Sequence, residues 1–186
     1  MKQEFTVKGL GLSSTRKYVR TKFPNDYRRW VDSLPPKSKE LYTNTINATD
    51  WYPVEDAYYH PLKQIAKLFF KGSDKDAALD IGNFSAEFAL KGVYKVFLMI
   101  ASPQYLMKVS KRVITKYYNP VDVHIDEVKK YSLVLSTNRI HNSDILEYRT
   151  IGWCITAMAL AGCKNVKFKY ITDLYDGMFS FRITWE

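Results

Sequence analysis

Histidines and nearby acidic side chains are the residues of this chain that could carry acid–base or metal chemistry. His60 stands in Tyr58-Tyr59-His60-Pro61, where the proline should break a helix, so its imidazole could contact a ligand or simply cap the helix. Asp122, His124 and Asp126 alternate along one strand face, which suits a metal ion but equally a solvated sheet face. No catalytic triad pattern and no glycine-rich phosphate loop accompanies them, so we expect no enzyme and no metal site.

A basic stripe is the second feature that could carry function. Lys108, Lys111, Arg112 and Lys116 recur about one turn apart in a helix that begins at Ser102-Pro103, and the net charge is +9. Such a stripe could bind an acidic protein or nucleic acid, or it could be the solvated face of an amphipathic helix. No nucleic-acid-binding motif accompanies it, so the sequence argues against nucleic acid as a partner.

Aromatic residues supply a third candidate site, because they make up 15% of the chain. Phe88, Tyr94 and Phe97 lie in an apolar stretch, and Trp153 lies in a later apolar helix. Ligand pockets are mostly apolar with few polar groups, so these residues, with His60, are candidates for the lining of a pocket. Plain core packing would use the same residue types, and the sequence does not separate the two.

These candidates are positioned by a helical first part and a sheet that follows it. Helical periodicity dominates residues 1–118, whereas alternating patterns over 121–125, 131–135, 166–170 and 179–185 predict strands. Between the strand pairs, residues 143–161 form a helix that is apolar almost all round, and Asp176-Gly177 predicts a hairpin turn. We expect one α+β domain over 1–186, in which 119–186 form an antiparallel sheet of strand-strand-helix-strand-strand order with one buried helix.

The cysteines and the hydropathy pattern bear on the compartment. Cys154 and Cys163 make no disulfide framework, and no signal-peptide pattern opens the chain. No apolar run reaches 18 residues, so we expect no membrane span and a cytoplasmic location.

Several weak motifs in a fixed order resemble a known superfamily. The C-terminal pieces are Gly152-Trp153, Ala161-Gly162, a Lys-Asn turn and the aromatic pattern from Phe179 to Trp185. They resemble the haem nitric-oxide-binding and 4-vinyl reductase domains. Upstream pieces resemble a related group of uncharacterised bacterial proteins, known largely from myxobacteria; they are Val7-Lys8-Gly9, Trp30-Val31, Leu34-Pro35, Trp51-Tyr52-Pro53, Ile81-Gly82, Ser85-Ala86 and Ser102-Pro103. The resemblance implies a ligand-binding or sensory domain, often dimeric, that feeds a signalling output.

Two departures from the family bear on cofactors. Residues 170–186 contain no cysteine, although many 4-vinyl reductase domains carry metal-suited cysteines near the final hairpin. The family's Tyr-x-Ser-x-Arg porphyrin clamp is matched only by Met178-x-Ser180-x-Arg182, in which we expect Ser180 and Arg182 to face solvent. The sequence therefore predicts no cofactor and argues against both zinc and haem.

Two functional hypotheses follow. The first is a non-enzymatic small-molecule-binding or sensory domain, with an apolar ligand in a pocket and an output through a partner protein, as a homodimer. The alternative is an interaction protein that uses its basic helices to hold an acidic partner or nucleic acid. The first is favoured, mostly through the resemblance.

Overall fold

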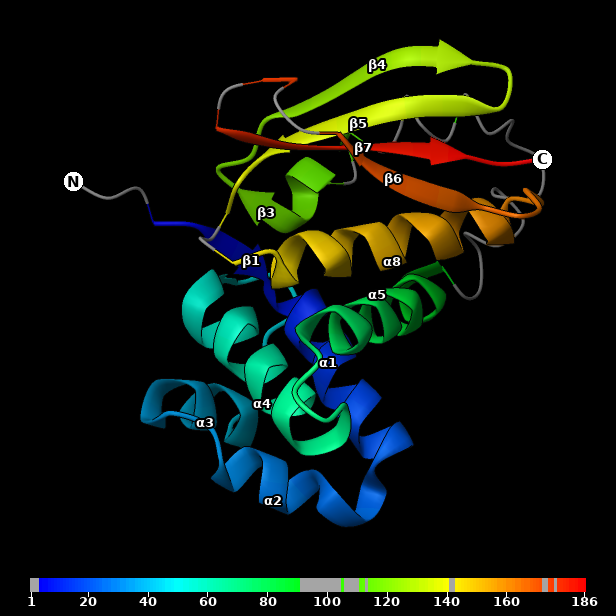
Figure 1. Cartoon of the computed structure of the whole chain (residues 1–186). Coiled ribbons are helices and arrows are strands. Elements are labelled where there is room, and N and C mark those ends of the chain that lie inside the picture. Colours follow the sequence, from blue (N-terminus) through cyan, green and yellow to red (C-terminus); the bar gives the residue numbers. More distant parts are fainter. Residues whose placement is uncertain are drawn as a thin grey trace.

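The computed structural model describes residues 4–90, 105, 111–112, 114–140, 143–171, 174–175 and 177–186. A helical part lies below and a four-stranded sheet lies above, with helices α8 and α5 stacked between them (Figure 1). This arrangement confirms the predicted α+β class with a helical N-terminal part and an antiparallel sheet. Among the described residues, no helix combines the length and the hydropathy that crossing a bilayer requires.

The helical part is built around a core that contains several large aromatic side chains, with Trp30, Tyr18 and Tyr42 fully buried. Pro61 stands at the start of α4, directly after a π-helical turn, so the break predicted at this proline is present as a change of helix type. The elements in chain order are β1 (Thr6–Lys8), α1 (Gly9–Lys22), η1 (Pro24–Asp26), α2 (Tyr27–Asp32), α3 (Pro36–Thr43), β2 (Trp51–Pro53), the π-helix η2 (Glu55–Tyr59), α4 (His60–Phe69) and α5 (Asp74–Leu90).

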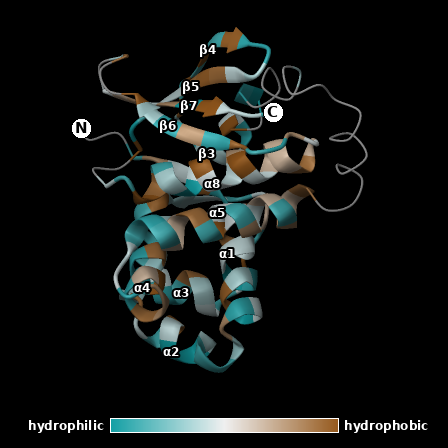
Figure 2. Ribbon diagram, turned by 45° about the vertical axis from the view of Figure 1, so that its right-hand side comes forward, coloured by the Kyte–Doolittle hydropathy of each residue, from teal (hydrophilic) through white to brown (hydrophobic). Residues whose placement is uncertain are grey.

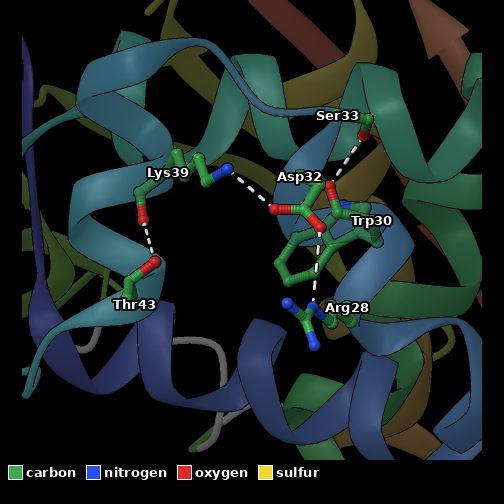
Figure 3. Close-up of polar contacts among 6 residues, drawn as sticks. All are labelled: Arg28, Trp30, Asp32, Ser33, Lys39 and Thr43. Atoms are coloured by element: carbon green, nitrogen blue, oxygen red, sulfur yellow. Dashed lines mark hydrogen bonds and ion pairs between the residues drawn. The ribbon is translucent and has the colours of Figure 1, made fainter.

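A short turn joins helices α2 and α3. Polar contacts stabilise it at the surface, and the buried side chain of Trp30 stabilises it from the core. Lys39 Nζ lies 2.7 Å from Asp32 Oδ1, and this contact, chiefly the hydrogen bond, lowers the pKa of Asp32 (Figure 3). The Ser33 hydroxyl donates to the Trp30 carbonyl at 2.7 Å and so satisfies an acceptor at the end of α2. The buried indole of Trp30 donates to the Pro61 carbonyl at 3.3 Å and thereby joins this turn to α4.

The sheet has the strand order β4-β5-β7-β6, with every neighbouring pair antiparallel. Its strands are β4 (Val123–Lys129), β5 (Ser132–Asn138), β6 (Lys167–Ile171) and β7 (Met178–Thr184); a separate short strand, β3 (Tyr118–Asn119), pairs with β1. Leu135 pairs with Phe181 and Leu133 with Ile183, and these side chains form the core between the sheet and α8. Figure 2 shows the hydrophobic residues along β5, β7 and α8.

The opposite face of β7 differs from the expectation at one of two positions. Ser180 is buried rather than solvated, and its hydroxyl shares a 2.8 Å hydrogen bond with Ser136 on β5. The difference arises because β5 and β7 are the central strands, where larger neighbours cover a short side chain. Arg182 is partly exposed and pairs with Glu127 at 2.6 Å.

Helix α8 (Ile145–Leu160) connects the two cores. Ile145 and Leu146 belong to the core of the helical part, whereas Ile151, Cys154 and Met158 pack under the sheet. A helix buried against two different layers needs apolar residues all round, which is the pattern that the sequence shows.

Two glycines allow α5 and α8 to approach closely. A β-carbon at Gly152 would overlap the backbone of Leu79 on α5, and one at Gly82 would overlap the backbone carbonyl of Arg149 on α8. The two helices therefore meet backbone to backbone at these positions, so neither glycine can gain a side chain unless the helices move apart.

We predict that Gly152→Ala lowers the free energy of unfolding by about 2 kcal/mol, because overpacking outweighs the better helix propensity of alanine. Urea denaturation measures the change. Gly72→Ala is the matched control: no heavy atom lies within 4 Å of its added methyl, so only its φ of +86° opposes it. It should cost about 1 kcal/mol. A Gly152→Ala protein as stable as wild type would contradict the close contact.

Candidate functional site

A cavity lies where α1, η2, α5 and α8 converge, next to residues 114–118. Its volume is about 70 Å³. The described residues that line it are Leu10, Gly11, Ser14, Tyr58, Ser85, Phe88, Ala89, Ile114, Tyr117, Tyr118, Arg149, Thr150, Trp153 and Cys154. Most of these are apolar or aromatic, and a few polar groups converge among them, which is the usual make-up of a ligand site.

Arg149 is the one charged side chain among the described lining residues, and it is only 3% exposed. Its guanidinium donates to Thr15 Oγ1 at 3.1 Å, to Ser85 Oγ at 3.1 Å and to Ser14 Oγ at 3.4 Å. The same group lies 4.1 Å from the centre of the Tyr58 ring, a distance suited to a cation–π contact. The arginine thus joins three helices of the helical part to α8.

Tyr58 can cross α1 only because residue 11 is a glycine: a β-carbon there would overlap the Tyr58 hydroxyl. Burial raises the pKa of the Tyr58 and Tyr118 phenols, although the charge of Arg149 opposes this in both. Burial also raises the pKa of the Cys154 thiol to about 12. All three groups are therefore protonated and uncharged at neutral pH.

Of the five residues predicted to line a pocket, two line the described cavity, one lies elsewhere and two are outside the described residues. Phe88 and Trp153 line the cavity. Tyr94 and Phe97 lie outside the described residues. His60 is absent from the described lining; it stands at the start of α4, where its Nε2 lies 3.4 Å from a carboxylate oxygen of Glu55. The histidine therefore lies beside Glu55 and outside the described cavity lining.

The other predicted candidates lie on the surface. Lys111, Arg112 and Lys116 are exposed, whereas Lys108 lies outside the described residues. His124 on β4 lies against the Tyr175 ring, with the ring centres 5.2 Å apart. The described part of the chain contains no group of three or more side chains suited to a metal ion.

Arg149, Ser14 and Ser85 are site residues that sequence reasoning missed. Arg149 is a lone cation inside an otherwise apolar helix, and that departure from the pattern was the available signal. Its three hydroxyl partners come from α1 and α5 and are separated from it by at least 64 residues in sequence. No local spacing rule connects positions so far apart.

Glu147 is a second buried charged group on α8, at 6% exposure. Neither of its carboxylate oxygens has a hydrogen-bond partner within the part of the chain that the structure describes. Arg139 lies 4.0 Å away. Burial raises the pKa of this carboxyl to about 7, and Arg139 only partly opposes the shift.

The raised pKa of Glu147 predicts a stability that falls as pH rises. The folded protein holds this proton up to about pH 7, whereas the unfolded chain releases it near the ordinary value of 4.5, so stability is full below pH 4.5 and is lost toward and beyond pH 7. The loss is at most about 3 kcal/mol relative to Glu147→Gln, which cannot titrate.

Thermal unfolding between pH 4.5 and 8 measures this difference. The exposed Glu40→Gln on α3 is the control and should follow wild type. Parallel pH profiles of wild type and Glu147→Gln would contradict the prediction.

No family model matches the sequence, and no curated protein matches it. Solved structures do match. An unliganded Fe(II) H-NOX protein from K. algicida shares the structure with a TM-score of 0.72 at 12% identity, over 96% of each chain. The chain has the H-NOX fold. A T. tengcongensis H-NOX mutant, I5F, is similar at a TM-score of 0.59 and 12% identity, over 96% of this chain and 97% of the other.

A third match bears directly on the cofactor. It is a structure described as modulating haem redox potential through protein-induced porphyrin distortion, with a TM-score of 0.67 at 11% identity over 95% of this chain and 99% of the other. The sequence argued against haem and predicted no cofactor, and these neighbours contradict that prediction. The argument was wrong because it weighed one short clamp motif, whereas the whole fold matches an Fe(II) H-NOX structure and a structure described by its haem redox potential.

Proposed function

We propose that this chain is a small-molecule-binding sensory domain whose ligand occupies the cavity beside Arg149. The observation that carries the proposal is the cavity itself: apolar walls with a few convergent polar groups, at the junction between the helical part and α8. The H-NOX fold supports a sensory domain in preference to the alternative, an interaction protein that acts through basic helices.

Haem is the first ligand to test, since the structural neighbours are haem proteins. The described walls fit it in two respects: they are apolar and aromatic, and Arg149 offers a buried cation for an acidic edge of the porphyrin. Tyr58, Tyr117, Tyr118 and Cys154 are the described lining residues whose phenol or thiol could ligate the iron. Haem would supply a redox-active iron and a visible absorption band.

A ligand bound here is well placed to change the relation between the two parts of the chain. The cavity walls come from α1 and α5 on one side and from α8 on the other, and α8 packs directly beneath the sheet. A ligand that binds one spacing of these helices better than another would shift the population toward that spacing.

We propose that this shift is passed to a separate partner protein. We propose also that the domain works as a homodimer in the cytoplasm without catalysis. Its nearest relatives, in this proposal, are the myxobacterial-type proteins.

The proposal predicts that filling the cavity abolishes ligand binding. Ala89→Phe places a ring in the lining, whereas Ala159→Phe places the same ring on an exposed position of α8. We expect ferric haem to bind wild type and Ala159→Phe equally, and to bind Ala89→Phe at least about tenfold more weakly. Absorbance titration in the Soret region measures the affinities.

Native mass spectrometry of the purified protein, compared with its denatured mass, tests for a ligand acquired during expression. Extra mass that denaturation removes would identify that ligand and support the proposal. Equal binding of haem to both phenylalanine variants, together with an unliganded native mass, would contradict it.

A further inference from the structure

Arg149 carries a positive charge that the described protein does not neutralise. Within the described residues, its guanidinium donates hydrogen bonds to three neutral hydroxyls, and its ring contact is to an uncharged tyrosine. Within the described residues, no carboxylate lies within the 4.0 Å of an ion pair with it. Arginine cannot escape the cost of burial by losing its proton, because a guanidinium stays protonated in proteins.

Three acidic residues on α8, α5 and η2 have neighbours other than Arg149. Glu147, one half-turn earlier on α8, is directed toward Arg139. Asp80 on α5 accepts a 2.6 Å hydrogen bond from the Tyr18 hydroxyl. Glu55 on η2 pairs with His60. A buried charge is ordinarily paired, so an unpaired cation in a cavity wall indicates an anion that arrives from outside.

We infer that Arg149 binds the carboxylate of an apolar ligand in this cavity. A guanidinium matches a carboxylate with two parallel hydrogen bonds. The Ser85 hydroxyl, 3.0 Å from that of Ser14, can donate to the same anion, whereas the single proton of Ser14 goes to the Gly11 carbonyl. One carboxylate beside Arg149 balances the single cation, whereas a doubly charged phosphate at the same position would leave an excess charge among apolar walls. Leu10, Phe88, Ile114 and Trp153 would enclose the apolar body of the ligand.

The inference rests on the proposed ligand-binding function and specifies its chemistry. Two sources share this chemistry: a porphyrin that carries propionates, and a medium-chain fatty acid. Each has a matched neutral probe of nearly the same shape, namely protoporphyrin IX against its dimethyl ester, and dodecanoate against dodecanol.

The hydroxyl partners of Arg149 do not depend on it for their hydrogen bonds. Ser14 and Thr15 both donate to the Gly11 carbonyl, and Ser85 is bonded to Ser14. Replacing the arginine by methionine therefore removes a buried charge and leaves these hydroxyls satisfied. We expect Arg149→Met to have a Tm equal to or above that of wild type in the ligand-free state, since an apolar replacement of a buried charge is often neutral or stabilising. A residue with a purely structural role would lower it.

Isothermal titration calorimetry and fluorescence quenching of the wild type, Arg149→Met and Arg149→Lys test the assignment. At least one acid should bind wild type about 30-fold or more tightly than its neutral partner. That preference should vanish in Arg149→Met and return in part in Arg149→Lys. Arg28→Met, which removes an arginine side chain that is 96% exposed, is the control and should bind like wild type. The acid that shows the preference identifies the source.

The outcomes separate this inference from the proposed function. Acids and neutral probes that bind wild type equally, and that Ala89→Phe excludes, would retain the pocket and overturn the role of Arg149. Unchanged preference for the acid in Arg149→Met would overturn it also. Failure of all four probes and of haem to bind wild type would overturn the ligand-binding function, and the carboxylate site with it.

Discussion

The close contact of α5 with α8 is the constraint on which the rest of the structure depends. Gly82 lies against the backbone of Arg149, so this contact fixes the distance of the arginine from α5. At that distance the guanidinium reaches hydroxyls on α1 and α5 together. Larger side chains at the two glycines would separate the helices, and the same arginine could no longer contact all of its partners.

The same contact places α8 between two cores of different composition. Aromatic side chains dominate the helical part, whereas the core under the sheet is built from alternating strand residues such as Leu133, Phe181 and Ile183. The cavity lies at the boundary between these two cores, since its lining includes Tyr58 of the first and Cys154 of the second. Protein interiors are generally close-packed, and the described walls of this space include one buried arginine, Arg149.

Both buried charges of α8 stand on the boundary, and their environments set opposite chemical states. Arg149 keeps its charge because a guanidinium does not lose its proton, so it can hold an anion. Burial raises the pKa of Glu147 to about 7, so this carboxyl gains or loses its proton near neutral pH. Helix α8 therefore carries a group of fixed charge, Arg149, two positions after a group that titrates, Glu147.

The sequence by itself determined the elements. Alternation and the aspartate-glycine turn located β6 and β7, and the continuous apolar pattern located α8, because such periodicities depend on local geometry. It also supplied Phe88 and Trp153 as pocket candidates, since ligand pockets are lined mostly by large apolar side chains. Only the tertiary structure brought Arg149 to Ser14 and Ser85 and directed His60 to Glu55. Contacts between residues far apart in the chain depend on how helices pack, and that packing has no local periodicity to read.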